Sequence, residues 1–184
     1  SVNILQSDTL PPQLPVIVPP PDATPSATIK LNGYGESSST VILVLNGNQA
    51  GETQVNEDGQ FSLDIPLAEG DNTLAVFAKD EAGNESATTN QVIVTRDEQA
   101  PNLEITQPEN GQQIELRRNQ VTTVKGKTDP NTTITLNGRR IFTQADGTFT
   151  TTYQLSEGEN KLLFVATDQA GNSISQELVV SFRL

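Results

Sequence analysis

Short runs in which apolar and polar residues alternate recur along the whole chain, and Gly, Asn or Asp bounds most of them. Val, Ile, Leu and Thr dominate these runs, which is typical of strands that bury one face. No segment keeps the 3.6-residue period of an amphipathic helix, so we expect no substantial helix. The predicted strands are Thr28–Leu31, Thr40–Leu45, Gln60–Ile65, Thr73–Ala78, Gln91–Thr95, Asn102–Thr106, Val121–Lys125, Thr132–Leu136, Thr148–Gln154, Lys161–Thr167 and Ile174–Phe182.

Dipeptides that favour tight turns separate these runs at matching places in the two halves of the chain. Asn46-Gly47 and Asp58-Gly59 lie in the first half, and Asn137-Gly138 and Asp146-Gly147 take the same places in the second. Gly adopts the positive φ that tight hairpins require, and Asn and Asp tolerate it. The sequence therefore predicts hairpins at the same points of two similar units.

The two halves are copies of one pattern. Residues 67–84 read LAEGDNTLAVFAKDEAGN, and residues 155–172 read LSEGENKLLFVATDQAGN, 88 positions later. Solenoid repeats run about 20 to 50 residues, so this period suits two small domains in tandem. Several short strands with a turn every 8 to 12 residues or so are typical of an immunoglobulin-like sandwich. We predict an all-β chain of two tandem immunoglobulin-like β-sandwich domains, residues 1–96 with an N-terminal extended, proline-rich lead-in, and residues 97–184.

The lead-in at residues 11–25 holds seven of the eleven prolines. Taken alone it could be a polyproline linker or a ligand for a proline-binding module. Pro12 and Pro19 recur as Pro101 and Pro108 in the second copy. Because proline is tolerated at the edges of sheets, the repeat favours an extended edge segment.

The first seven residues, SVNILQS, leave three interpretations open. They could be the last strand of a preceding domain, or a tether from an N-terminal anchor that this chain lacks. They could also pair with the open edge of a neighbouring molecule, which would make the protein a filament subunit. The third interpretation requires an unfilled groove or edge on one of the sandwiches.

Two turns carry a resemblance to a known family. Asp80-x-Ala82-Gly83-Asn84 and Asp168-x-Ala170-Gly171-Asn172 each follow an alternating strand and a Glu-Gly-x-Asn turn. They resemble the bacterial Ig-like repeats of cell-surface and secreted proteins, including glucodextranase domain B. The resemblance covers residues 8–184 and implies a stalk, spacer, adhesin module or enzyme appendage outside a bacterial cell. A membrane is implied only through the missing N-terminal anchor.

Composition excludes several kinds of chemistry. The chain has no Cys and no His, which rules out thiolate or ordinary zinc sites and nucleophilic triads that contain His. Carboxylates alone could still support acid–base catalysis, but we expect no enzyme. The net charge of −12 disfavours binding to nucleic acid or to an anionic membrane.

Four carboxylates are candidate calcium ligands: Asp80 and Asp168 in the two repeated turns, and Asp97 and Glu98 between the copies. Calcium takes six to eight oxygen ligands, typically, and no EF-hand spacing is present. The alternative is that each turn Asp accepts backbone N–H bonds. No cofactor other than calcium is expected.

Basic residues are concentrated in the second copy. Residues 8–96 hold 12 acidic and 3 basic side chains, a net −9, whereas residues 97–184 hold 11 acidic and 8 basic, a net −3. The candidate binding residues are Arg117, Arg118, Lys125, Lys127, Arg139 and Arg140. They could form a patch for an anionic polymer or for the acidic half of another copy, or they could be ordinary solvent-facing cover.

These observations favour a non-catalytic structural or adhesive module of the bacterial cell surface, acting as a tandem spacer or stalk. The alternatives are a binding module for envelope glycan or an anionic polymer, and the filament subunit. Partners would be other surface proteins, envelope polymers or further copies of the chain. Tyr34 and Tyr153 are the aromatic residues available to a glycan.

Overall fold

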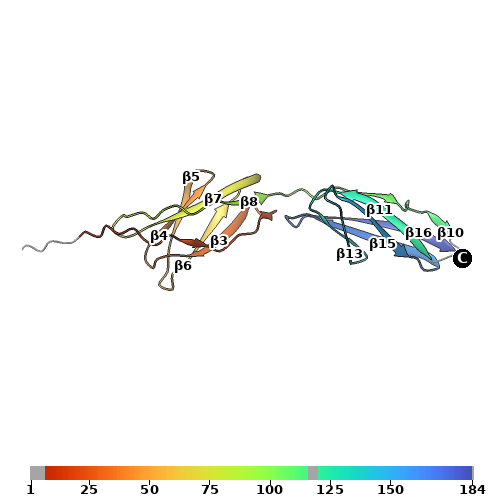
Figure 1. The fold of residues 1–184 in the computed structure, drawn as a ribbon, viewed down its shortest axis with the longest axis horizontal. Helices are drawn as coiled ribbons and strands as arrows, with labels where there is room; N and C mark the ends of the chain where they lie inside the picture. Colours follow the sequence, from red (N-terminus) through yellow and green to blue (C-terminus); the bar gives the residue numbers. More distant parts are fainter. Residues whose placement is uncertain (1–6, 116–119, 184) are drawn as a thin grey trace, which may run out of the picture. The chain divides into compact units, whose positions relative to one another are not determined.

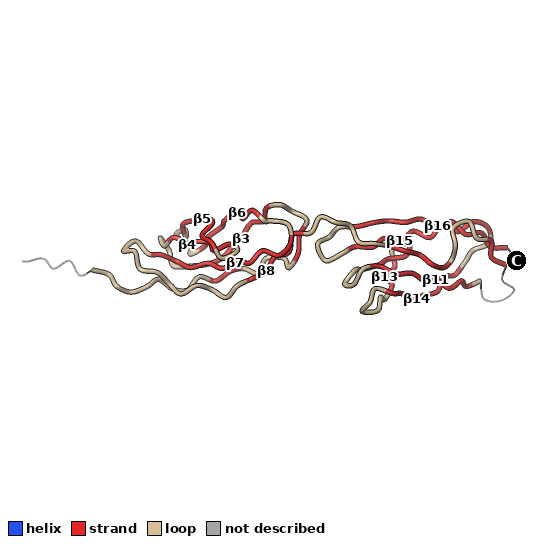
Figure 2. The backbone as a smooth tube through the Cα atoms, turned by 90° about the horizontal axis from the view of Figure 1, so that it is seen from above, coloured by secondary structure: helices blue, strands red, loops and turns tan. Residues whose placement is uncertain are grey.

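The computed structural model describes residues 7–115 and 120–183, and every regular element in them is a β-strand. The chain divides into two compact units, Ser1–Asp97 and Glu98–Leu184. In the described part no helix has the length and apolar character needed to cross a membrane. The predicted all-β class is confirmed, and each unit is a sandwich of two sheets (Figures 1 and 2).

Unit 1 packs a five-stranded sheet against a three-stranded sheet. The five-stranded sheet has the order β2-β8-β7-β4-β5, and the other has the order β1-β3-β6. The strands are β1 (Val16–Ile17), β2 (Ala23–Thr24), β3 (Thr28–Tyr34), β4 (Thr40–Leu45), β5 (Asn48–Gln54), β6 (Gln60–Pro66), β7 (Gly70–Lys79) and β8 (Val92–Arg96).

Unit 2 repeats this arrangement with a five-stranded sheet of order β10-β16-β15-β12-β13 and a three-stranded sheet of order β14-β11-β9. The strands are β9 (Leu103–Gln107), β10 (Gln113–Glu115), β11 (Val121–Thr128), β12 (Thr133–Leu136), β13 (Arg139–Ile141), β14 (Thr148–Gln154), β15 (Gly158–Thr167) and β16 (Ser173–Arg183).

The proline-rich lead-in of unit 1 is divided between the two sheets. β1 pairs antiparallel with β3, and β2 pairs parallel with β8. Pro19, Pro20 and Pro21 lie between these two short strands. Because proline has no N–H to donate to a ladder, the chain leaves one sheet here and joins the other.

Each unit has its own hydrophobic core, in which a phenylalanine from the repeated Asp-Gly-x-Phe turn lies over a glycine of the adjacent strand. Phe61 lies against Gly33 in unit 1, and Phe149 lies against Gly126 in unit 2. The ring fills the space that a side chain at the glycine would occupy, which explains why the turn motif recurs.

Candidate functional site

The two repeated Asp-x-Ala-Gly-Asn turns are closed by their own side chains. Asp80 accepts hydrogen bonds from the Asn84 backbone N–H and side-chain amide, both at 2.8 Å. Asn84 also donates to the carbonyl oxygen of Asp8 at 3.2 Å. The side-chain bond from Asn84, together with weaker backbone bonds, lowers the pKa of Asp80 below 3.8. The carboxylate thus has the turn-closing role that the sequence left as an alternative to calcium binding.

Asp168 closes the second turn in the same way. It accepts the backbone N–H of Asn172 at 2.8 Å and its side-chain amide at 3.0 Å. Asp97 lies at the end of β8, where its N–H donates to the Thr24 carbonyl at 3.0 Å, and Glu98 begins unit 2. Among the described residues no three acidic side chains come together as metal ligands. Calcium binding by the four candidate carboxylates stays a prediction.

The structure separates the candidate basic residues into two pairs. Lys125 and Lys127 lie on the exposed face of β11, in the three-stranded sheet of unit 2. Arg139 and Arg140 lie in β13, an edge strand of the five-stranded sheet. Arg117 and Arg118 fall outside the described residues.

Arg139 and Arg140 border a groove of about 600 Å³ between the edge strands β13 and β14. The residues that line it are Val121, Leu136, Asn137, Arg139, Arg140, Ile141, Thr151, Thr152, Tyr153 and Gln154. The described part of the lining therefore contains two arginines, amides, hydroxyls and one tyrosine, and no acidic side chain.

The groove is open because the segment between the Asn-Gly turn and the Asp-Gly turn is shorter in unit 2 than in unit 1. The Asn-Gly turn that starts the connection recurs 91 positions later, but the Asp-Gly turn that ends it recurs 88 positions later, so unit 2 has three residues fewer between them. β5 is seven residues long and lies against β6 in unit 1, whereas β13 has three residues. The edge that β5 covers in unit 1 has no such cover among the described residues of unit 2.

The side chains beside the groove also differ between the copies. Tyr153 and Thr151 occupy the places that Ile65 and Leu63 hold in unit 1, given the displacement of 88 residues. Ile65 is fully buried whereas Tyr153 is half-buried, and Leu63 and Thr151 are both half-buried. Unit 1 therefore closes this side of the sandwich with aliphatic packing, and unit 2 leaves a polar surface there.

The pairing of β12 with β13 sets the directions of the two arginines. Leu136 lies opposite Arg139, so the two side chains share the face of the sheet that is turned to the core and the groove. Thr135 lies opposite Arg140, which places Arg140 on the outer rim. Both arginines are exposed.

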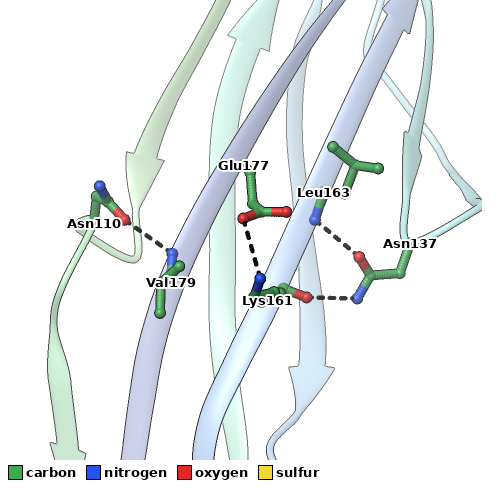
Figure 3. A network of polar contacts seen from close by, with 6 residues as sticks. All are labelled: Asn110, Asn137, Lys161, Leu163, Glu177 and Val179. Atoms are coloured by element: carbon green, nitrogen blue, oxygen red, sulfur yellow. Dashed lines mark hydrogen bonds and ion pairs between the residues drawn. The ribbon is translucent and has the colours of Figure 1, made fainter.

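Asn137 fixes the turn at the mouth of the groove (Figure 3). Its side-chain oxygen accepts the Leu163 N–H at 2.8 Å, and its amide donates to the Lys161 carbonyl at 3.0 Å. The same amide donates to the Tyr153 hydroxyl at 3.1 Å. Asn137 and Gly138 both have positive φ, as the sequence predicted for this hairpin. The tyrosine ring is thus held in a defined position beside the groove.

The backbone register of β14 determines which of its groups face the groove. Leu155 N–H donates to the Gln120 carbonyl at 2.6 Å, and Thr128 N–H donates to the Gly147 carbonyl at 3.0 Å. Hydrogen-bonded pairs recur every second residue in an antiparallel ladder. The odd-numbered residues of β14 therefore direct their backbone groups to β11.

The even-numbered residues direct theirs the other way. The N–H and C=O groups of Thr152 and Gln154 point toward the groove, where the described residues supply no neighbouring strand. This part of β14 is an open sheet edge. Sequence reasoning missed it because backbone groups leave no signal in side-chain pattern.

Phe142 was also missed. It follows β13 directly and is 90% exposed. A large apolar residue in the shortened connection was the available signal.

A second feature of unit 1 is the parallel pairing of its second and last strands. β2 lies beside β8, with Ala23 opposite Thr95. Thr95 N–H donates to the Asp22 carbonyl at 2.9 Å, and Asp97 N–H donates to the Thr24 carbonyl at 3.0 Å. The segment that follows β1 is thus attached along the final strand of the unit.

Unit 2 has the same closure between β10 and β16. Ser181 N–H donates to the Gln112 carbonyl at 3.0 Å, and Gly111 N–H donates to the Val179 carbonyl at 2.7 Å. The Asn110 side chain accepts the Val179 N–H at 2.9 Å and extends the closure (Figure 3). We call the β2–β8 and β10–β16 pairings the terminal clamps.

Known proteins match this chain in sequence along most of its length. Bacillopeptidase F of Bacillus subtilis is 33% identical over 158 residues, which are 84% of this chain and 10% of that protein. A PII-type proteinase of Lacticaseibacillus paracasei is 30% identical over 174 residues, 85% of this chain and 9% of that protein. The chain spans about a tenth of the length of these curated relatives.

A solved structure supports the fold. The fibronectin(III)-like modules of Clostridium thermocellum CbhA have a TM-score of 0.61 at 14% identity, covering 92% of this chain and 94% of that one. Residues 19–95 match the family model of a bacterial Ig domain, and residues 101–183 match that of glucodextranase, domain B. The resemblance found in the sequence is confirmed, and the chain belongs to the bacterial Ig-like domain repeats.

Proposed function

We propose that the chain is a non-catalytic structural module of a secreted or cell-surface protein, in which two Ig-like domains form a spacer that resists pulling. The relatives support the structural part, because this chain corresponds to a tenth of each proteinase and consists of Ig-like domains. They also support a place outside the cell. An adhesive role is the finer form of this proposal and depends on the groove of unit 2.

The observation that carries the proposal is the terminal clamp in each unit. A pull on the two ends of a unit first passes through its first strand, β1 or β9. It then acts on the start of the second strand, β2 or β10, and on the end of the last strand, β8 or β16. Because these strands are parallel, the two points of attachment lie at opposite ends of the pair. The hydrogen bonds of a clamp are then loaded together in shear, and cannot open one after another.

The proposal predicts two separate unfolding events when the chain is stretched by its ends in single-molecule force spectroscopy. Each event should lengthen the chain by about 300 Å, since roughly 90 residues extend by about 3.5 Å each and the folded unit already spans some tens of Å. One combined event, or extension without a force peak, would contradict the proposal.

Reciprocal proline variants make each unit the control for the other. Thr95→Pro removes a clamp donor of unit 1, and Ser181→Pro removes one of unit 2. Each variant should lower the unfolding force of one event and leave the other event unchanged. If neither variant alters a force while the fold is intact, the clamps do not bear the pull.

A further inference from the structure

We propose that the groove of unit 2 binds an extended acidic segment of another polypeptide, which adds to the open edge of β14 as a further strand. The proposal goes beyond a spacer role, because it assigns a recognition surface to one of the two domains. It rests on three features: the open edge, the difference between the copies, and the charge of the lining.

The β14 edge lacks the devices that keep sheet edges from pairing. Its sequence, TFTTTYQ, contains neither a charged residue nor a proline. Natural proteins commonly place lysine, proline or inward-pointing charges on exposed edges. The equivalent strand β6 carries Asp64 and Pro66 and also has β5 against it. Unit 1 thus protects this edge twice, whereas the described residues of unit 2 leave β14 open.

The backbone groups of the open edge suit a peptide. Thr152 and Gln154 present N–H donors and C=O acceptors two residues apart along the strand. An added strand satisfies such a row with its own alternate N–H and C=O groups. A saccharide has no matching repeat of donors and acceptors, so the edge favours polypeptide over glycan.

Charge selects the kind of peptide. Arg139 and Arg140 border the groove and no acidic side chain among the described residues lines it, although the whole chain carries a net −12. Arginine pairs with carboxylates through two parallel hydrogen bonds. Acidic residues at every second position lie on one face of the added strand and can meet Arg140 on the outer rim, while the other face of that strand is turned to the groove beside Arg139.

The experiment adds an acetylated, amidated peptide TEVEVET to the full chain labelled with ¹⁵N, and follows backbone amides by NMR. We expect shifts confined to residues around the groove, and hydrogen exchange of the Thr152 and Gln154 amides at least about tenfold slower. The lysine counterpart TKVKVKT should not bind. Two N-methylated versions, each blocking one edge of TEVEVET, test the pairing, and one of them should lose binding.

Matched charge reversals locate the site. The double variant Arg139→Glu, Arg140→Glu should weaken binding of TEVEVET about tenfold or more. The double variant Lys125→Glu, Lys127→Glu makes the same change of charge in the same unit but outside the groove, and should leave the affinity within about twofold. Equal losses in both variants would overturn the assignment to the groove.

Two further probes test for other ligands of the groove. Trigalacturonate is an acidic glycan without peptide groups, and a peptide SVNILQS copies the first seven residues of the chain. Tighter binding of trigalacturonate, or indifference of TEVEVET to both N-methylations, would overturn strand addition. Tighter binding of SVNILQS would overturn the acidic occupant in favour of self-association. A spacer without a binding groove would leave the NMR spectrum unchanged with every probe.

Discussion

At the scale of single residues, the most informative side chains are two buried asparagines of the Glu-Gly-x-Asn turns. Asn72 is fully buried, accepts the Ala68 N–H at 2.9 Å, and donates to the carbonyls of Ala68 and Gly70. Asn160 forms the same set of bonds in unit 2. A buried amide is tolerated when its hydrogen bonds are made, and here each asparagine holds the turn in place through its bonds to the backbone.

Replacing either asparagine by alanine should therefore destabilise one unit strongly. Asn72→Ala leaves partly buried backbone groups of unit 1 without these partners, which should cost about 2–4 kcal/mol. In a domain of this size that lowers the midpoint of thermal unfolding by roughly 10 °C or more. Calorimetry should show one shifted transition and one unshifted transition, with the roles exchanged for Asn160→Ala. The exposed Asn32→Ala is the control, and an equally large effect there would contradict the argument.

The lowered pKa of Asp80 predicts how the stability of unit 1 changes in acid. The bonds from Asn84 hold its pKa in the folded state below 3.8, which is lower than in the unfolded chain. A depressed carboxyl pKa stabilises the fold above the unfolded pKa, and this contribution is lost as pH falls through the folded pKa. Denaturant unfolding measured between about pH 7 and pH 3 should thus show a loss of stability that begins near pH 4.

Asp80→Asn should flatten this acid-dependent loss, because no proton is then taken up at the turn. Glu81→Gln removes a neighbouring charge without touching the turn bonds and serves as the control. If Asp80→Asn and the parent chain lose stability in parallel below pH 4, the turn carboxylate does not govern acid sensitivity. In unit 2, hydrogen bonds from Asn102 and Thr148 lower the pKa values of Asp129 and Asp146, which gives the same direction.

At the scale of the strands, the contact of Phe149 with Gly126 shows how close packing spans a sheet. A methyl group at Gly126 would collide with the Phe149 ring and the Glu104 carbonyl. Gly33 has the same surroundings in unit 1, where Phe61 and the Val16 carbonyl lie close. Both glycines therefore let an aromatic ring of one strand lie on the backbone of the next.

Gly126→Ala should cost about 1–3 kcal/mol, since the ring and the β9 backbone must both move. Gly51→Ala is the matched control, because a methyl group there would meet only ordinary contacts with Leu63. Urea unfolding of the two variants measures the difference. A loss for Gly126→Ala no larger than that for Gly51→Ala would show that the ring adapts freely.

The sequence predicted strands well wherever apolar residues alternate. The predicted Thr40–Leu45 and Thr148–Gln154 coincide with β4 and β14. It missed β5 because NQAGETQ presents no apolar face, and this strand forms by completing the edge of β4 through backbone bonds. Strands without a buried face leave no period to detect.

The groove was predictable only in part. Arg139, Arg140 and Tyr153 were candidates from the sequence, and the shorter spacing between the two turns was visible in the repeat offsets. Two things were not visible: that the missing residues uncover an edge, and that Lys125 and Lys127 lie elsewhere. Both depend on which strands become neighbours in space. Strand pairing determines this, and it cannot be deduced from the amino-acid composition.

At the scale of the whole molecule, charge divides the two units, with −9 over residues 8–96 and −3 over residues 97–184. Such an excess of carboxylates favours solubility and attracts divalent cations. The same carboxylates in the turns are already hydrogen-bonded to asparagine. Calcium would then depend on Asp97 and Glu98.

Thermal unfolding in excess calcium and in EDTA tests these residues. Because hydrogen bonds from asparagine already occupy the carboxylates of Asp80 and Asp168, we expect no shift of the midpoint from these two residues. A specific site would raise the midpoint by several degrees or so at saturation, since ligand binds the folded state alone. Such a rise, abolished by Asp97→Asn together with Glu98→Gln, would establish a calcium site where the two units meet in sequence.

The way Asn46 and Asn137 are held at the hairpin turns bears on the chemical lifetime of the protein. Asparagine before glycine is prone to deamidation, in which the glycine nitrogen attacks the side-chain amide. Each of these amides is bonded at both its oxygen and its nitrogen, by partners that include Thr73 and Asn72 in unit 1 and Leu163 and Lys161 in unit 2. The folded domains thus protect the Asn-Gly sequences from deamidation. A unit that has been unfolded by a pull loses these hydrogen bonds and exposes its Asn-Gly sequence to the reaction.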